Sequence, residues 1–431
     1  MIRTSYYQDL TKMNTFGMKV KARCFMEYDS VADLVDIEFE ELARPVLHIG
    51  GGSNLLFTDD FKGTVLHSKI DFIEVLDECQ CIPETPSHSV GPSPEPAAAG
   101  FSLQRSTGPF AESLERVGKC LLHTNGTSSE TCQSLNKVLV SVGAGVVFDD
   151  FCAWAAKEGL WGVENLSYIP GEVGASAVQN IGAYGVEVKD VIHKVYCYDT
   201  LEEEFVSFSV EECGYGYRDS IFKNPEVKGR YIVTHVVFAL SRDPRPVLDY
   251  GHLKEAVAEA ASLSSDPRLP GGRHPLAEGG MSLPSDTTSA FDARVTPAII
   301  RKVIIKIRKE KLPEPSVVGS AGSFFKNPVI SLEHFARIES AAKAEHGPDY
   351  KVPHYNLPDG TVKVPAAWMI EQCGWKGKRS GGAAVWDKQP LVIVNYTGNA
   401  YPEEIVGLEK RIIASVKAKF GVDLHPEVEH V

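Results

Sequence analysis

Two low-complexity stretches interrupt this chain and limit where it can form a packed core. One covers residues 78–136 and is rich in proline, serine and threonine, and the other covers residues 262–292 with similar composition. Such segments bury too little apolar surface to offset the entropy lost on ordering, so both are expected to be mobile surface insertions. The folded part must therefore come from residues 1–77, 137–261 and 293–431.

Length, charge and hydropathy narrow the class of protein. A chain of 431 residues is too long for one ordinary core, so roughly two or three domains are expected. The formal net charge of −13 argues against nucleic acid or a membrane surface as partner. The sequence has no apolar run of about 18 residues, and residues 1–10 do not form a signal peptide. These features predict a cytoplasmic protein.

The 9 cysteines show no regular spacing, which favours reduced thiols over a disulfide framework. Cys79 and Cys81 are too close together for the usual zinc-binding spacing, and no histidine pair accompanies them. No metal site is therefore expected.

Outside the two insertions, the pattern predicts an α+β fold. Short apolar runs predict strands at residues 46–49, 138–142, 191–198, 204–208 and 231–240. Helices are expected at residues 149–157 with Asp149 and Asp150 as caps, at 297–309 after Thr296, at 365–373 and at 401–420.

Two glycine-rich segments are candidates for ligand binding. Residues 50–55 follow a predicted strand and expose backbone N–H groups that suit a diphosphate, although a tight structural turn accounts for the glycines equally well. The dinucleotide fingerprint is absent because residue 55 is leucine. Residues 169–185 combine few charges with many small side chains, as expected for backbone around a large flat ligand. A glycine-rich strand pair packed on a helix is the alternative.

A third segment, residues 319–328, places the hydroxyl of Ser323 among glycines and before Phe324, Phe325 and Lys326. Glycines allow a ligand to approach the backbone closely, and the phenylalanines can exclude water. Clusters of glycine and serine are more often plain turns, so the segment becomes informative only together with others.

Several motifs, in order along the chain, resemble those of the UDP-N-acetylenolpyruvoylglucosamine reductase (MurB) family, in its first structural subtype with a tyrosine loop. They are Gly-Gly-Gly-Ser-Asn-Leu-Leu at 50–56, the Ile-Pro-Gly segment at 169–185, Gly-Tyr-Arg-Asp-Ser-Ile-Phe-Lys at 216–223, Lys-Leu-Pro at 311–313, Gly-Ser-Phe-Phe-Lys-Asn-Pro at 322–328, Gly-Gly-Ala-Ala at 381–384 and His-Pro-Glu-Val at 425–428.

The resemblance implies a bipartite FAD-binding portion of the vanillyl-alcohol-oxidase (PCMH) type, residues 1–77 and 137–261. A C-terminal α+β substrate-binding domain, residues 293–420, and a tail, residues 421–431, that returns to the flavin would complete the molecule. It also implies a monomeric oxidoreductase with non-covalent FAD and NADPH as reductant. The reaction would convert UDP-N-acetyl-3-O-(1-carboxyvinyl)-glucosamine into UDP-N-acetylmuramate, a step of peptidoglycan precursor synthesis.

The resemblance further implies roles for individual residues. Hydride addition to the enolpyruvyl group leaves an enolate, against which Arg218 would lie, and Ser323 would protonate it. Glu427 would act in its protonated form, because an ionised carboxylate would repel the enolate, or through a hydrogen bond that polarises the substrate. Substrate contacts are expected from Tyr217, Tyr250, Lys311, Asn327 and Gln372. Residues expected at the cofactor are Gly50, Gly51, Gly52, Ser53, Asn54, Leu55, Pro170, Gly171, Gly174, Ala175, Gln179, Asn180, Gly182, Ala183, Tyr184 and Gly185.

Two other functions remain open at this point. A flavin oxidase would share the two glycine-rich segments but has no reason to carry Arg218, Ser323 and Glu427 together. The same three residues weigh against a non-catalytic UDP-sugar-binding protein. The second insertion begins soon after Tyr250, where it could change access to the closing loop.

Overall fold

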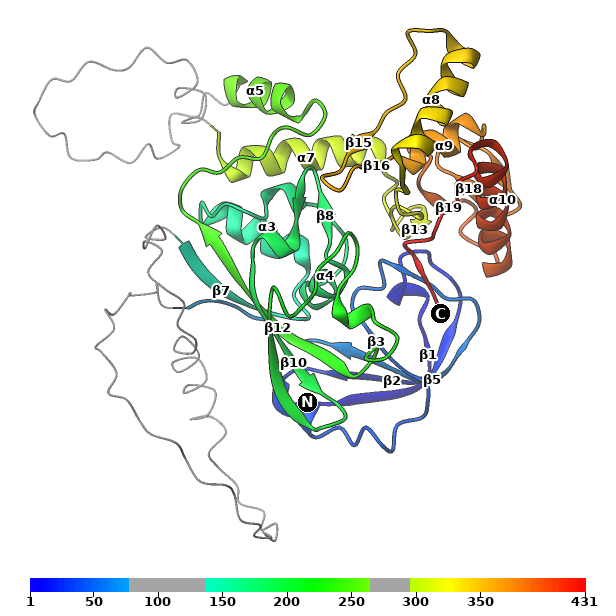
Figure 1. Cartoon of the computed structure of the whole chain (residues 1–431). Helices are drawn as coiled ribbons and strands as arrows, with labels where there is room; N and C mark the ends of the chain where they lie inside the picture. Colours follow the sequence, from blue (N-terminus) through cyan, green and yellow to red (C-terminus); the bar gives the residue numbers. More distant parts are fainter. Residues whose placement is uncertain (77–136, 264–294) are drawn as a thin grey trace, which may run out of the picture.

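The computed structural model describes residues 1–76, 137–263 and 295–431 (Figure 1). The insertions expected at residues 78–136 and 262–292 lie outside these ranges, apart from Ser262 and Leu263, which end helix α5 (Leu253–Leu263). Within the described parts of the chain, no helix is both long enough and apolar enough to cross a membrane.

The N-terminal part forms a four-stranded sheet in the order β1-β2-β5-β3. Its strands are β1 (Arg3–Asp9), β2 (Lys21–Tyr28), β5 (Phe61–Ser68) and β3 (Val46–Ile49). Strand β5 is central and parallel to both neighbours, and its nearly continuous buried run is typical of a strand covered on two faces. The predicted strand at residues 46–49 is confirmed. Helix α1 (Val31–Val35) begins at Ser30, whose hydroxyl accepts a hydrogen bond from the N–H of Asp33.

A second, five-stranded sheet has the order β11-β10-β12-β7-β6. Neighbouring strands in this sheet are all antiparallel. The strands are β11 (Glu204–Ser209), β10 (Ile192–Asp199), β12 (Tyr231–Ser241), β7 (Lys137–Gly143) and β6 (Ile73–Val75). Helices α3 (Phe148–Lys157) and α4 (Val173–Gln179) share a core with this sheet. In that core Phe151 and Phe238 are fully buried, with their ring centroids 4.7 Å apart. The four strands predicted in this region are confirmed.

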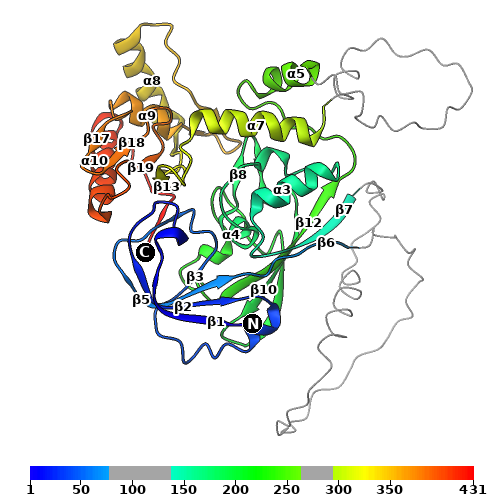
Figure 2. The ribbon, with the colours of Figure 1, turned by 180° about the vertical axis from the view of Figure 1, so that it is seen from behind.

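One cap prediction in this region was wrong. Asp149 and Asp150 lie in the first turn of α3, and the N-cap is Val147, which has no capping side chain. The two carboxylates still favour the helix through its dipole, and Asp149 forms an ion pair with Arg301 of α7 (Pro297–Lys311). Figures 1 and 2 show α7 lying along α3.

The C-terminal part combines helices with two small sheets. Helix α7 begins at Thr296, as predicted, with the Thr296 hydroxyl accepting from the N–H of Ile299. The other helices are α8 (Leu332–His346), α9 (Ala366–Gln372) and α10 (Pro402–Phe420). The sheets, β13-β19-β18-β17 and β14-β16-β15, consist of β13 (Gly319–Ser320), β19 (Ile393–Asn395), β18 (Ala383–Val385), β17 (Arg379–Ser380), β14 (Val329–Ser331), β16 (Thr361–Lys363) and β15 (Tyr355–Asn356).

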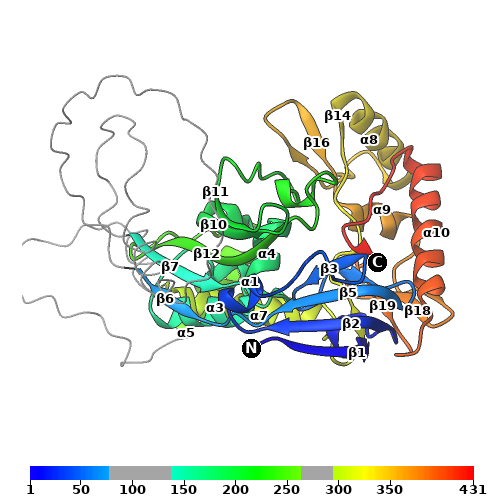
Figure 3. The same cartoon turned by 90° about the horizontal axis from the view of Figure 1, so that it is seen from below.

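The two ends of the chain share one core and one short ladder. Leu10, Phe16 and Leu56 from the N-terminal part pack in the same cluster as Phe324 and Leu408. Strand β20 (Glu429–His430) pairs in parallel with β4 (Leu55–Leu56), so the C-terminus lies beside the first sheet (Figure 3). The remaining elements are β8 (Gly182–Ala183), β9 (Val186–Glu187), η1 (Thr11–Met13), η2 (Glu164–Leu166), η3 (Val188–Asp190) and η4 (Ile221–Lys223).

Candidate active site

The two glycine-rich segments lie against each other. Ser53 Oγ donates a hydrogen bond to the carbonyl of Pro170 at 3.0 Å. A Cβ atom added at Gly51 would lie 3.4 Å from Gly171 Cα, and one at Gly52, where φ is +60°, would lie 1.9 Å from the carbonyl oxygen of Met13. The first turn is therefore a tight structural turn that abuts the second segment, and its role as a diphosphate site stays a prediction.

The second segment contains a short helix followed by a hairpin. Helix α4 ends at Asn180, which has the left-handed conformation with φ of 43°, and strands β8 and β9 follow. Asn180 Nδ2 donates to the carbonyl of Gly216 at 2.7 Å, and Ser220 Oγ donates to the carbonyl of Val178 at 2.7 Å. These bonds tie the turn that carries Arg218 to the end of α4.

Arg218 is held in a left-handed backbone conformation, with φ of 55°, and its guanidinium points into the same region. Nη1 and Nη2 donate to the carbonyls of Asn180 and Gly182 at 3.2 and 2.6 Å. Nε lies 2.8 Å from Glu427 Oε1, but the N–H is not aligned with that oxygen, and Nε is buried without a hydrogen bond to the described residues. A left-handed arginine is strained, so the surrounding bonds must hold it there.

Glu427 reaches this site because the C-terminal tail is pinned on two sides. Its N–H donates to the carbonyl of Phe324 at 2.8 Å, and its carbonyl accepts from Asn54 Nδ2 at 3.0 Å. The side chain is 16 % exposed. Burial raises the pKa of the Glu427 carboxyl above its ordinary value, against the opposing effects of Arg218, Lys223 and Lys326. A carboxyl in this setting holds its proton to higher pH than an exposed glutamic acid.

Ser323 adjoins the residue that binds the tail. Phe324 and Phe325 are 0 and 1 % exposed, with ring centroids 5.2 Å apart, whereas Ser323 is only partly buried. The N–H of Lys326 donates to the carbonyl of His425 at 2.9 Å, so the segment runs beside the tail. Ser323 therefore lies at the edge of the core, next to Phe324, whose carbonyl binds the backbone of Glu427.

Tyrosines and a lysine gather next to this group. Tyr217 Oη accepts from Asn327 Nδ2 at 3.3 Å, and the rings of Tyr184 and Tyr250 meet edge to face at 5.7 Å. Lys363 Nζ lies 4.7 Å from the centroid of the Tyr217 ring and 5.9 Å from that of Tyr355. Sequence analysis did not identify Lys363 or Tyr355, because they come from a hairpin with no motif of its own.

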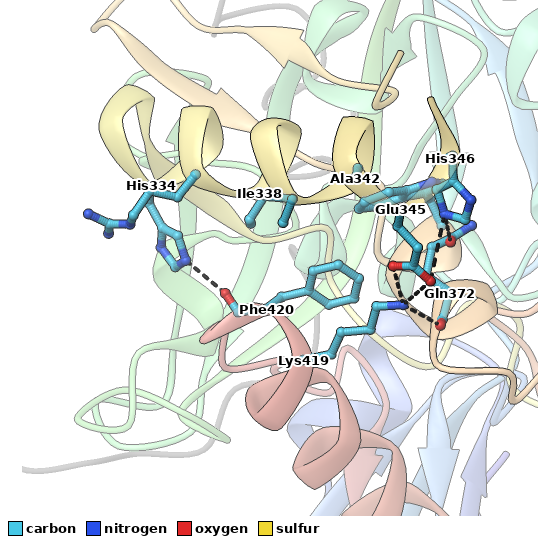
Figure 4. A pocket seen from close by; sticks show the side chains of 11 residues that line it. His334, Ile338, Ala342, Glu345, His346, Gln372, Lys419 and Phe420 are labelled. Atoms are coloured by element: carbon cyan, nitrogen blue, oxygen red, sulfur yellow. Dashed lines mark hydrogen bonds and ion pairs between the residues drawn. The ribbon is translucent and has the colours of Figure 1, made fainter. Parts of the chain in front are cut away.

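The other two candidate substrate residues lie apart from this group. Lys311 is exposed at the end of α7, where its carbonyl accepts from Trp386 Nε1 at 3.1 Å. Gln372 lines a cavity of about 170 Å³ between α8, α9 and α10 (Figure 4). Its Oε1 lies 3.0 Å from His346 Nε2, and its carbonyl accepts from Lys419 Nζ at 3.2 Å. These contacts join it to the helices around that cavity and not to Arg218 or Glu427.

Arg308 of α7 belongs to none of the sequence motifs, yet it contacts the second glycine-rich segment. Its Nε donates to the carbonyl of Tyr168 at 3.1 Å, and burial lowers its pKa. Tyr184 of the second glycine-rich segment also contacts it. The available signal was its helical spacing, since residues 304 and 308 share the face that Ile304 buries.

The residues present fit a flavin nucleotide. Small side chains in both glycine-rich segments leave backbone accessible, and a Cβ atom at Gly182 would come within 3.0 Å of Arg218 Nη1. The largely buried guanidinium of Arg218, paired with Glu427, provides a positive charge for an anionic group. The arrangement therefore suits a charged substrate placed next to a planar cofactor.

Comparisons with known proteins agree with this geometry. Residues 314–431 match the model of the UDP-N-acetylenolpyruvoylglucosamine reductase C-terminal domain, and residues 119–204 match that of an FAD binding domain. The chain is 42 % identical to the UDP-N-acetylenolpyruvoylglucosamine reductase of Bacteroides fragilis, over 98 % of both chains. It is 39 % identical to the reductase of Neisseria meningitidis serogroup A, over 98 % of this chain and 96 % of that protein.

A solved structure has the same overall fold. The UDP-N-acetylenolpyruvylglucosamine reductase (MurB) from Thermus caldophilus aligns with a TM-score of 0.52, covering 100 % of this chain and 98 % of that one. The sequence identity is 19 %, so this likeness concerns the fold alone.

Proposed function

The chain belongs to the UDP-N-acetylenolpyruvoylglucosamine reductase family, and from this premise we propose that Arg218, Ser323 and Glu427 are its catalytic residues. The enzyme is an FAD-containing, NADPH-dependent reductase of the enolpyruvyl ether of a UDP-sugar, with UDP-N-acetylmuramate as product. The observation that supports the assignment best is the meeting of Arg218 with Glu427, whose backbone is bonded to Phe324 next to Ser323.

The chemistry supplied by bound FAD is transfer of a hydride, taken from NADPH, to the enolpyruvyl double bond. The glycines at 50–52, with the segment from Pro170 to Gly185, would hold its diphosphate and ring system. Arg308 adds a partly buried cation beside Tyr184 on that side of the site.

Arg218 stabilises the negative charge that develops on the substrate carboxylate and enolate. Two of its guanidinium nitrogens are occupied by the carbonyls of Asn180 and Gly182, which fix the plane of the group. The Nε side of the guanidinium lies 2.8 Å from Glu427 Oε1, so the group is already oriented toward the proposed acid and little reorganisation accompanies the reaction.

Ser323 donates a proton to the enolate carbon, and Glu427 supports that step in its protonated form. A serine hydroxyl is a weak acid, so the transfer depends on close approach, on the water-excluding Phe324 and Phe325, and on nearby positive charge from Lys326. The raised pKa of Glu427, caused chiefly by burial, favours the neutral carboxyl and avoids repulsion of the enolate.

The remaining assignments follow the same proposal. Tyr217, Tyr250 and Asn327 contact the sugar nucleotide, and Lys311 meets its diphosphate. Residues 1–77 and 137–261 serve FAD binding, residues 293–420 serve substrate binding, and residues 421–431 return to the flavin. We also propose a cytoplasmic monomer that binds neither nucleic acid nor membrane, in keeping with the net charge of −13.

A two-stage spectroscopic titration of the FAD-loaded protein tests this function. NADPH should bleach the flavin absorbance, and the enolpyruvyl UDP-sugar should restore it. In Ser323→Ala, bleaching should be unchanged, while reoxidation by substrate slows by about 10²- to 10⁴-fold, because a general acid is lost. Equal damage to both stages would refute the role of Ser323. Rapid reoxidation by oxygen with no response to the sugar would identify an oxidase instead.

A further inference from the structure

Lys223 is a partly buried lysine at the end of η4 that the reaction described above does not use. Its ammonium group donates to Gln179 Oε1 at 3.2 Å and to the backbone carbonyl of Arg218 at 3.0 Å. One side chain thus joins Gln179, the last residue of α4, to the backbone of Arg218.

Both hydrogen-bond acceptors of Lys223 are neutral. Removing an ammonium group from water is costly, and burial lowers the pKa of Lys223. An amide or hydroxyl would satisfy two neutral oxygens at lower cost, so the positive charge itself calls for an explanation.

Arg218 connects Lys223 to Glu427, because its backbone carbonyl binds the Lys223 ammonium and its Nε lies 2.8 Å from Glu427 Oε1. This carboxyl is faced by Arg218 and Tyr217 from the turn at 216–219, by Lys223 from η4, and by Lys326 from the segment before β14. The three cations favour ionisation of Glu427 and oppose the effect of burial. Lys223 is the one among them that also holds the strained backbone of Arg218.

We propose that Lys223 is a positioning residue of the reductase, which holds Arg218 in its left-handed conformation and sets the charge around Glu427. The inference rests on the proposed function. It assigns Lys223 two separable effects: hydrogen bonding that places Arg218 against the substrate, and a charge that limits how firmly Glu427 holds its proton.

The test compares Lys223→Met, Lys223→Gln and Lys223→Arg with the wild type in both half-reactions across pH. In Lys223→Met, bleaching by NADPH should be retained, and reoxidation by substrate should slow by about 10- to 100-fold through misplacement of Arg218. The alkaline limb of the reoxidation profile should move to higher pH, because loss of a cation favours neutral Glu427. Lys223→Gln keeps a hydrogen-bond donor but has no charge. Its reoxidation by substrate should therefore slow less than that of Lys223→Met, while its alkaline limb moves to higher pH by the same amount. Lys223→Arg keeps the charge, so its alkaline limb should lie at the wild-type pH.

The matched control is Lys228→Met, which removes an exposed lysine from the same loop together with its ion pair to Glu429. This variant should change neither the rate of reoxidation by substrate nor the pH of its alkaline limb, since exposed ion pairs contribute little to stability. If reoxidation slows in both Lys223→Met and Lys223→Gln but the alkaline limb stays at the same pH, the role of Lys223 is purely structural and the proposal is overturned. Unchanged reoxidation rates and pH profiles in all Lys223 variants would also overturn it. Failure of substrate to reoxidise the wild-type flavin would instead refute the proposed function.

Discussion

At the scale of single residues, this site depends on charges whose environments differ. Arg218 is strained, partly buried and bonded to two carbonyls, whereas Glu427 is desolvated and faced by cations. Under the proposed mechanism, the positive charge of Arg218 opposes the charge of the enolate, and burial shifts Glu427 toward the neutral form that does not repel it.

The raised pKa of Glu427 leads to a prediction about pH. If the protonated carboxyl supports proton transfer, the rate of reoxidation by substrate should fall as the pH rises through that pKa, because the carboxyl then ionises. Glu427→Gln cannot ionise at this position. Its reoxidation by substrate should therefore be slower at every pH and should not show this fall in rate, the alkaline limb, as the pH rises. Single-turnover absorbance measurements over a range of pH check the outcome, with Glu429→Gln as the control. Persistence of the same limb in Glu427→Gln would exclude Glu427 as its source.

At the scale of elements, the turn between β3 and β4 shows how a single backbone carbonyl, that of Met13, restricts the residue at position 52 to glycine. Gly52 and Gly159 both have positive φ, of 60° and 70°. A Cβ atom at Gly52 would lie 1.9 Å from the carbonyl oxygen of Met13, whereas nothing lies within 4 Å of one at Gly159. The two glycines therefore share the conformational requirement but differ in packing.

Gly159→Ala should reduce the free energy of unfolding by about 1 kcal/mol, through the left-handed conformation alone. Gly52→Ala should cost about 1 to 3 kcal/mol more, because the turn must move away from Met13. It should also weaken FAD retention, since the turn abuts the second glycine-rich segment. Urea unfolding and flavin content provide the measurements. Equal losses of stability would show that the turn relaxes freely.

At the scale of the whole molecule, the active site depends on contacts between the two ends of the chain. Val431 accepts a hydrogen bond from the N–H of Thr58 at 2.8 Å, and Glu429 donates to the carbonyl of Asn54 at 2.9 Å. These contacts hold Glu427 between the first glycine-rich turn and the Ser323 segment. Residues distant in sequence are thereby brought together in the proposed catalytic group.

Deletion of residues 429–431 removes the β4–β20 pairing and should leave Glu427 loosely placed. Bleaching by NADPH should persist, and reoxidation by substrate should slow by about 10-fold or more, because misplacement of a catalytic group is costly. Thr58→Ala is the matched control, since it loses the side-chain bond to Val431 but keeps the backbone bond. An unaffected reoxidation rate in the truncated protein would show that the tail is held without its last strand.

Local pattern in the sequence determined the longer elements. Strands β7, β10, β11 and β12 and helix α7 were predicted because alternation, helical periodicity and the Thr296 cap are properties of neighbouring residues. The family, the cofactor and the reaction followed from motifs read in order along the chain. Strands of two or three residues such as β13 and β20 escaped prediction, because they exist only through their distant partners.

Tertiary structure alone decided how the site is assembled. Nothing local in the sequence pairs Arg218 with Glu427 or brings Lys363 over the ring of Tyr217. Nor does it reveal that Gln372 lines a separate cavity. Motifs specify the types of residue that the chemistry needs, but distances, burial and the charges around an acid arise from chain segments that meet only after folding.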